Sequence, residues 1–347
     1  MRVKKEVICI LLMAMTMLLN ACSSDESGAQ TVTTGEEPVG KQVQLMTYAP
    51  YFTEKEAPRR APSGFTAYTP DKTTDMGIYM IKDGDLSYKE ERLRYASKWF
   101  AFFEAEADED YTVYGYMPKI TGMSSSLSSV TSDGATLTIN GIKPVTADDI
   151  CIITGVKETD TDLKEGQFHW FMANANDNFY MYLLMDHLYA SVKFSLKVSE
   201  EYAQLRTIKL KTMTLSTDKG SVNAVISLTH NTTGASPITS VSYSLTTGDN
   251  CAAEIFNDAE GQALSSTTPI AVSACFAPTL SDNLTLVSTY DVYDSKGNLI
   301  RANCKATNKI PNLEAFRGQR VQLNMKVDPT YLYIMSDKDL DNLFTIE

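Results

Sequence analysis

Histidine is scarce in this chain, and no catalytic motif surrounds the few that are present. The 347 residues include three histidines, His169, His187 and His230. His187 follows Asp186, and such a pair can orient a catalytic base, but a nucleophile would have to come from a distant part of the chain. The zinc-protease, nucleophile-turn, phosphate-loop and dinucleotide motifs are all absent from the sequence. The sequence therefore gives no catalytic residue and no cofactor site, and we expect a protein that is not an enzyme.

Paired cysteines and an excess of positive charge are also missing. The six cysteines include no C-x-x-C pair, so the spacing of a zinc site is absent and we expect no metal ligands. Cys275 and Cys304 could face each other across a hairpin, although separate thiols are the favoured interpretation. The net charge of −12 argues against nucleic-acid partners, because phosphate binding needs lysine and arginine.

Past residue 21 the chain has no apolar run long enough to span a membrane. Before residue 21 lie a short positive region and the apolar run Val7–Leu19. That run is too short to cross a hydrocarbon layer about 30 Å thick. The next residues, Leu19-Asn20-Ala21-Cys22, look like the lipobox of a bacterial lipoprotein signal peptide. We therefore expect cleavage before Cys22 and acylation of Cys22. Several acyl chains on this residue would anchor the protein to the outer membrane at the cell surface, since one chain alone binds weakly.

Removal of residues 1–21 leaves 326 residues, enough for two domains of ordinary size. The signal carries a net charge of +2, so the remainder carries −14. Residues 22–40 are rich in Ser, Thr, Gly and Glu with almost nothing apolar, which is typical of a flexible tether. Regular structure is expected to begin near Lys41.

Short strand-like segments with turn signals between them follow along the rest of the chain. Two of them, Ala190–Val198 and Val321–Val327, alternate apolar and polar residues, which predicts one buried and one wet face. Residues 290–299 read as a hairpin with its turn at 294–298. Glu90–Asp110 fits a helical face or strands, and we favour strands. The further expected strands are Gly77–Ile81, Tyr111–Tyr116, Ala135–Ile139, Ile150–Ile153, Arg206–Leu215, Val222–Leu228, Ile238–Leu245 and Leu284–Val292.

The composition and this pattern predict an all-β protein built of antiparallel β-sandwiches. Several segments, in their order and spacing, also resemble the fimbrillin-like proteins of Bacteroidales, and together with the lipobox the resemblance covers most of the chain beyond the signal. The segments that carry it are Tyr111–Pro118, Leu137–Ile142, Asp148-Asp149-Ile150, Thr154-Gly155 and the histidine-containing strand His187–Phe194.

This resemblance implies two tandem transthyretin-like β-sandwich domains, which we place at residues 41–185 and 186–347. It also implies a structural or adhesive subunit of a type V pilus, exported as a lipoprotein, with other pilus subunits as partners. In that family an arginine-specific or trypsin-like protease removes the first strand, and the terminal strand of another subunit fills the groove.

The chain offers a match for each part of that assembly mechanism. Lys41–Thr53, with Val43, Leu45 and Tyr48, matches the removable strand. Arg59 and Arg60 lie in a Pro-rich segment just after it and match the cleavage site, although a plain surface loop explains them equally well. The candidate donor strand is the apolar tail with Leu343, Phe344 and Ile346.

Two alternatives remain open at this stage. Anchor subunits of the family keep their first strand, and the sequence does not separate stalk, tip and anchor roles. A surface glycan-binding lipoprotein would also combine β-sandwiches with an acidic tether, and Phe168, Trp170 and Phe171 are candidate sugar-stacking side chains, although core positions are favoured for them. A ligand on a host or bacterial surface is expected in either case, and its identity does not follow from the sequence.

Overall fold

Almost every described element is a β-strand, which confirms the all-β fold class. The computed structural model describes residues 39–54, 65–67, 74–173, 178–230, 235–280, 284–311 and 313–327, all within the compact unit Pro38–Glu347. Among these residues the one α-helix is α2 (Glu200–Leu205), and the Ser199 side chain caps it by accepting a hydrogen bond from the Tyr202 N–H. No helix in the described ranges has the length and apolar character needed to cross a bilayer.

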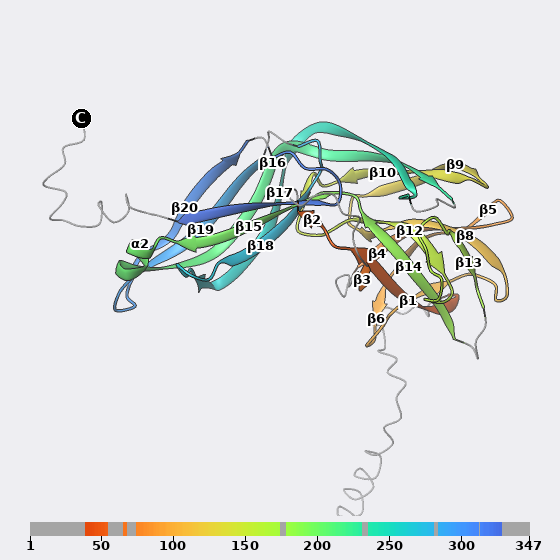
Figure 1. Cartoon of the computed structure of the whole chain (residues 1–347), viewed down its shortest axis with the longest axis horizontal. Coiled ribbons are helices and arrows are strands. Elements are labelled where there is room, and N and C mark those ends of the chain that lie inside the picture. Colours follow the sequence, from red (N-terminus) through yellow and green to blue (C-terminus); the bar gives the residue numbers. More distant parts are fainter. Residues whose placement is uncertain are drawn as a thin grey trace, which may run out of the picture. The chain divides into compact units, whose positions relative to one another are not determined.

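The largest sheet has ten strands, all from residues 41–187 (Figure 1). Two short strands branch from its main path, β13 (His169–Phe171) beside β8 and β3 (Phe65–Ala67) beside β1. The main path runs through β5 (Asp85–Arg92), β4 (Asp75–Lys82), β8 (Asp110–Lys119), β12 (Cys151–Lys157), β14 (Phe179–His187), β1 (Lys41–Pro50), β7 (Trp99–Phe103) and β6 (Arg94–Tyr95).

Two further sheets combine strands from early and late parts of the chain. The expected division into domains 41–185 and 186–347 stays a prediction, and both sheets contain strands from each side of it. The six-stranded sheet holds β20 (Leu299–Ile310), β19 (Leu284–Asp294), β16 (Arg206–Thr229), β10 (Gly134–Ile142), β9 (Ser124–Thr131) and β17 (Ile238–Ala263). The five-stranded sheet runs β11 (Val145–Thr146), β18 (Ile270–Phe276), β15 (Ala190–Val198), β21 (Gln319–Val327) and β2 (Thr53–Glu54).

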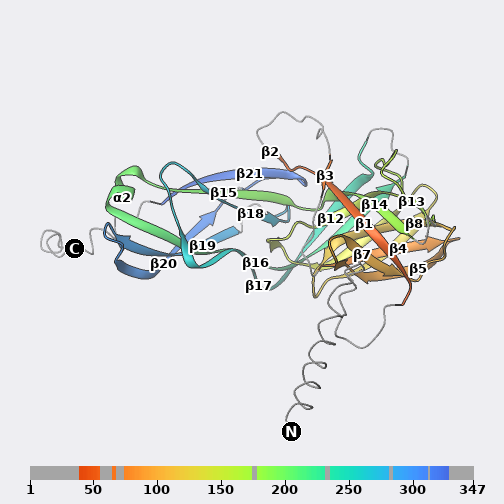
Figure 2. The same ribbon diagram turned by 90° about the horizontal axis from the view of Figure 1, so that it is seen from below.

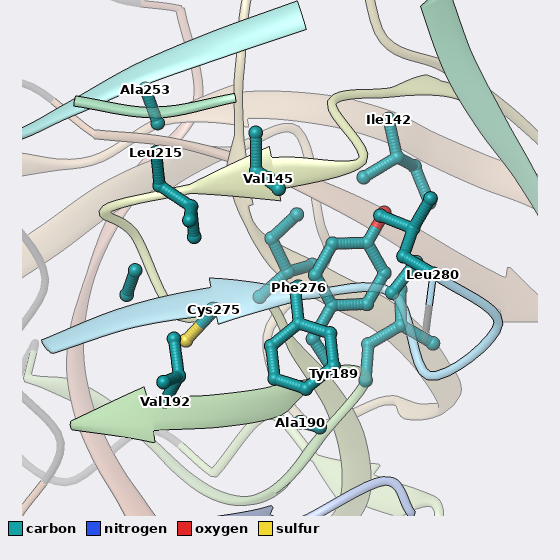
Figure 3. Close-up of a cluster of buried hydrophobic side chains, with 14 of the residues drawn as sticks. Ile142, Val145, Tyr189, Ala190, Val192, Leu215, Ala253, Cys275, Phe276 and Leu280 are labelled. Atoms are coloured by element: carbon teal, nitrogen blue, oxygen red, sulfur yellow. The ribbon is translucent and has the colours of Figure 1, made fainter. Parts of the chain in front are cut away.

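Two hydrophobic clusters fill the interior, and the ten-stranded sheet separates them. Along β8 the side chains alternate, so Val113 enters the first cluster and Tyr114 the second. The first cluster is lined by that sheet and includes residues of β1, β7 and β14. The second draws on all three sheets, and Figure 3 shows Val145, Phe276 and Val192 converging there from β11, β18 and β15.

Two expectations about local structure are confirmed. Glu90–Asp110 contains the end of β5 and the strands β6 and β7, and no helix is described there. The hairpin at residues 290–299 is formed by β19 and β20, and the Asp294 carboxylate accepts hydrogen bonds from the Lys296 and Asn298 N–H groups, both at 2.8 Å. An aspartate that satisfies the turn's own backbone donors is the physical reason that this turn is readable from sequence.

Two expectations differ from the structure. The segments at 206–215 and 222–228 belong to one long strand, β16, because Asp218, Lys219 and Gly220 bend the strand with register shifts instead of ending it. Strand β15 also lacks the expected solvent-exposed face, since Ser191 and Ser195 on that face are buried as well. Strand β15 lies between β18 and β21, and short serine side chains on such a central strand are covered by their neighbours.

Candidate functional site

We call residues 41–54 the first-strand segment. The candidate site is the part of the fold that binds this segment. Strand β1 lies inside the ten-stranded sheet and is paired along both of its edges. It runs parallel to β14 from Val43 opposite Phe179 to Tyr48 opposite Leu184. Its other edge is antiparallel to β7 near its start and to β3 near its end. Departure of β1 would therefore leave unpaired backbone donors and acceptors on both sides.

Alternate side chains of β1 enter the first hydrophobic cluster. Val43 is 0% exposed, Leu45 3% and Ala49 4%. Burying a valine or leucine side chain contributes about 1.5–3 kcal/mol, so this face stabilises the bound strand substantially. Tyr48 differs from the sequence expectation, because it is half-buried on the opposite face. The period of two along a strand cannot bring an even-numbered residue to the face of Val43 and Leu45.

After Pro50 the segment leaves the ten-stranded sheet and joins the five-stranded one. The expected single strand Lys41–Thr53 is thus two strands, β1 and β2, separated by Tyr51 and Phe52. The Thr53 N–H donates to the Gly318 carbonyl at 2.9 Å, and β2 runs parallel to the start of β21. Figure 2 shows β2 beside β21, and β1 on the other side of the short link that Tyr51 and Phe52 form between β1 and β2.

His187, the last residue of β14, contacts the first-strand segment where it passes from β1 to β2. Its Nε2 lies 2.8 Å from the Pro50 carbonyl oxygen, and its Nδ1 lies 2.8 Å from Asp149 Oδ2. The Phe52 ring stacks on the imidazole with 3.8 Å between the ring centroids. The backbone and the side chain of the first-strand segment therefore both contact one histidine.

The acidic partner of His187 is not the one suggested by the sequence. Successive residues of a strand point to opposite faces, so Asp186 turns away from the imidazole. Its carboxylate instead pairs with Arg317 at 2.6 Å, and Arg317 also donates to the His187 carbonyl at 2.9 Å. Asp149, remote in sequence, takes the place beside the ring.

The electrostatic surroundings of His187 favour its charged form. Burial alone lowers the pKa of His187, because it penalises the imidazolium. The Asp149 carboxylate opposes this through its hydrogen bond and its charge, with help from Asp186 and the Pro50 carbonyl. The net result is a pKa raised above the ordinary value of 6.5.

Asp149, Cys151 and His187 are the one group of three metal-donor side chains found among the described residues. Cys151 Sγ lies 3.5 Å from Asp149 Oδ2 and 3.8 Å from His187 Nδ1. Ligand atoms around a tetrahedral zinc, at about 2.0–2.3 Å from the ion, lie about 3.3 Å or more apart. The 2.8 Å between His187 and Asp149 is instead the length of a charge-assisted hydrogen bond, so we interpret the group as an ion pair.

The same group does not have the properties of a nucleophilic site. Burial, followed by the nearby Asp149 carboxylate, raises the pKa of the Cys151 thiol well above its ordinary value. A buried neutral thiol is a poor nucleophile, and His187 Nδ1 already faces Asp149. Cys275 and Cys304 are free thiols in different sheets, which agrees with the interpretation that they are separate.

The other histidines and the aromatic run lie elsewhere. The Tyr114 hydroxyl and His230 Nε2 are 2.5 Å apart, and burial lowers the pKa of His230. Phe168 and Trp170 are wholly buried, which confirms core positions for these two rings. The expectation is wrong for Phe171, which is exposed because it lies on the opposite face of β13 from Trp170.

Several residues singled out from the sequence lie outside the described ranges. These residues are Cys22, Arg59, Arg60, Leu343, Phe344 and Ile346.

Two contacts of the site had no signal in the sequence. One is the backbone carbonyl of Pro50, and the other is Asp149 as the partner of His187.

The comparisons with known proteins give distant structural neighbours only. No family model matches the chain, and no curated protein matches it. A candidate cell adhesion protein from Bacteroides fragilis has a TM-score of 0.39 at 12% identity, over 82% of this chain and 93% of its own. A fimbrial protein from Bacteroides vulgatus has a TM-score of 0.33 at 13% identity, over 83% and 96% of the two chains.

The fimbrial anchor protein Mfa2 from Porphyromonas gingivalis has a TM-score of 0.23 at 12% identity, over 76% of this chain and 82% of its own. Because all three TM-scores are below 0.5, the activities of these proteins are not carried over to this chain.

Proposed function

We propose that this chain is a pilus-related cell-surface protein that polymerises by exchanging its first strand for a strand of another subunit. The observation that carries this proposal is the position of β1. It is paired on both edges, it fills part of a hydrophobic cluster, and yet it lies near the start of the fold. Its loss would open a groove without breaking the chain that forms the rest of the sheet.

The groove has the properties that strand addition requires. The edges of β14 and β7 would supply backbone hydrogen bonds, and the places of Val43, Leu45 and Ala49 would supply alternating pockets. Phe344 and Ile346 are two residues apart, so both would point into such pockets from one face of a strand. We therefore propose the tail as the donor and other copies or other pilus subunits as the partners.

Proteolysis is the proposed trigger. β2 and β3 are joined by the segment that contains Arg59 and Arg60, so a cut there would separate the first-strand segment from the rest of the protein. Before the cut, the segment and its seat belong to one chain and stay together. After the cut, dissociation becomes irreversible in practice if a second subunit occupies the groove.

Anchoring through Cys22 completes the proposal. A multiply acylated Cys22 would hold the precursor at the outer membrane, and a cut after Arg60 would release the assembling subunit from its lipid. We propose no catalytic role for any residue, because the one Asp–Cys–His group of the described residues is a partly buried ion pair beside a neutral thiol.

A retained first strand is the second candidate, and the tight seat of the segment favours it. The segment is held by β14, β7, β3, His187 and Gly318 together. An anchor, or a stand-alone surface binder, would keep all of these contacts and would not polymerise.

Limited trypsin treatment of the purified precursor distinguishes the two. Mass spectrometry verifies the cut, and size-exclusion chromatography with light scattering gives the mass. Polymerisation predicts oligomers, and it predicts their absence in R59A/R60A and after deletion of residues 340–347. K296A, which removes a basic residue from an exposed turn elsewhere, is the matched control and should still form oligomers. Cut protein that loses the segment yet stays monomeric would contradict strand exchange.

A further inference from the structure

We propose that His187 is a proton-dependent clamp on the first-strand segment, whose imidazolium bridges the Asp149 carboxylate and the Pro50 carbonyl, so that the segment is held when His187 is protonated and loosened when it is not. This inference rests on the proposed function, because release of the segment is the step that precedes assembly. The feature behind it is one histidine whose two ring nitrogens both contact oxygen atoms, one of them on the segment itself.

The number of hydrogens on the ring decides which contacts are possible. A carboxylate and a backbone carbonyl are both acceptors, so each contact needs an N–H on the histidine. Neutral imidazole has one N–H, and the second nitrogen would then face an oxygen lone pair at 2.8 Å. Imidazolium has two and satisfies both partners. The observed geometry therefore matches the protonated ring.

The location of His187 makes this proton matter for the segment. The side chain of His187 is 4% exposed, so water neither screens its charge strongly nor replaces a lost contact. The Phe52 ring covers one side of the imidazole, and the Arg320 guanidinium lies 5.1 Å from the Phe52 ring centroid. When the segment leaves, the carbonyl partner and this cover leave together.

The other titratable groups around the cluster are accounted for. Asp186 is paired with Arg317, so these two charges largely balance each other. The thiols of Cys151 and Cys275 have pKa values raised well above normal by burial, so they stay neutral over the range that matters. The remaining charged or titratable groups coupled to this cluster are Asp148, Glu165, Tyr243 and Arg320.

The direction of the pH dependence follows from linkage. The coupling between the proton and the segment lies in the Pro50 carbonyl, because Asp149 stays beside the ring when the segment leaves. An unprotonated Nε2 would face the Pro50 oxygen at 2.8 Å in the bound state but would face water in the released state, so the bound state holds the proton more tightly. The clamp is present while His187 carries both ring protons and is lost as pH rises through its raised pKa. Release should therefore be slow in mildly acidic solution and faster in alkaline solution.

The test uses protein cut by trypsin in the cold, quenched, and transferred to buffers at about pH 6 and about pH 9. Mass spectrometry after rapid gel filtration gives the rate at which residues 41–54 leave. We expect about a tenfold faster loss at the higher pH, which is a difference of about 1.4 kcal/mol in the barrier. H187Q keeps an amide donor but cannot take up the proton, so its loss rate should be the same at both pH values.

H169Q makes the same substitution at an exposed histidine on β13 and should keep the full pH dependence. Equal loss rates for the wild type at both pH values would overturn the clamp, as would a pH dependence that survives in H187Q. D149N is a second variant, which tests the clamp if H187Q fails to fold. It keeps an acceptor at this position but removes the charge, so it should move the pH at which release accelerates to a lower value.

A measurement on uncut protein separates failure of the clamp from failure of the proposed function. Nitrogen NMR of the His187 ring should show protons on both nitrogens just above pH 6.5, the ordinary pKa of histidine, because the pKa of His187 is raised. A ring that is neutral at pH 6.5 and below would overturn the clamp whether or not the protein polymerises. If the doubly protonated ring is found and the cut segment never leaves, the clamp stands and strand exchange is wrong.

Discussion

Strands β1 and β9 are of similar length, but they are held in opposite ways. β1 is paired along both edges and buries every second side chain. β9 is the end strand of its sheet in the part of the chain that the structure describes, and it pairs with β10. Its sequence is serine-rich, and most of its residues are exposed.

The comparison explains why β1, and not β9, is the strand proposed to exchange. Loss of β9 would uncover a few polar contacts and leave little for another strand to bind. Loss of β1 would expose two backbone edges and an apolar groove, so a replacement strand would recover most of what the first one contributed. Strand exchange thus needs an interior strand that is detachable, not one that is weakly held.

The largest expected effect is on stability, through matched leucine substitutions in the two strands. L45A removes a side chain that is 3% exposed and should lower the free energy of unfolding of the uncut protein by about 2–5 kcal/mol. L127A, on the half-buried Leu127 of β9, should cost about 1 kcal/mol. Urea unfolding of both variants measures the difference. Equal costs would mean that β1 does not occupy the groove as described.

A smaller effect on the free energy of unfolding is expected from loss of the histidine clamp. Among the described residues, β9 has no equivalent of this clamp. H187Q should lower the free energy of unfolding of the uncut protein by about 1–3 kcal/mol in mildly acidic solution. The gap between wild type and H187Q should narrow as pH rises above 6.5, because the wild type loses its imidazolium there. Urea midpoints across this range provide the measurement, with H169Q as the control. A gap that widens with pH would contradict the sign of the linkage.

The smallest effect is expected on the second face of β1 itself. Y48A removes a half-buried side chain that points away from the first cluster, so it should cost about 1 kcal/mol or less. Comparison with L45A in the same strand then tests which face is buried. If Y48A were as costly as L45A, the assigned alternation of β1 would be wrong.

Local pattern predicted the strands well, and tertiary contacts decided the rest. The turn at residues 294–298 and the strands near Trp99 follow from residue types that act over a few positions. The continuity of β16 through Asp218 and Gly220 does not, because pairing with β17 carries the strand past a turn-like sequence. Ser191 is buried for a similar reason, since the strands beside it cover a short side chain.

The candidate site was predictable only in part. A strand that begins near Lys41 was predictable, and Val43 and Leu45 are buried as expected, whereas the expected burial of Tyr48 was wrong. The clamp could not, because it joins His187 to a residue 38 positions away and to a backbone carbonyl, which carries no sequence signal. The adjacent Asp186 was the misleading neighbour, and the alternation of side chains along β14 explains why.

The central claim is that the strand beside β14 changes from one chain's own residues to another's. A photo-crosslinking residue in place of Tyr182, which lies opposite Met46 on the half-buried face, reports which strand is there. In the uncut precursor it should crosslink to residues 41–50 of the same chain. After the cut, oligomers should carry crosslinks to residues 340–347 of a second chain. Oligomers whose crosslinks remain on residues 41–50 would contradict strand exchange.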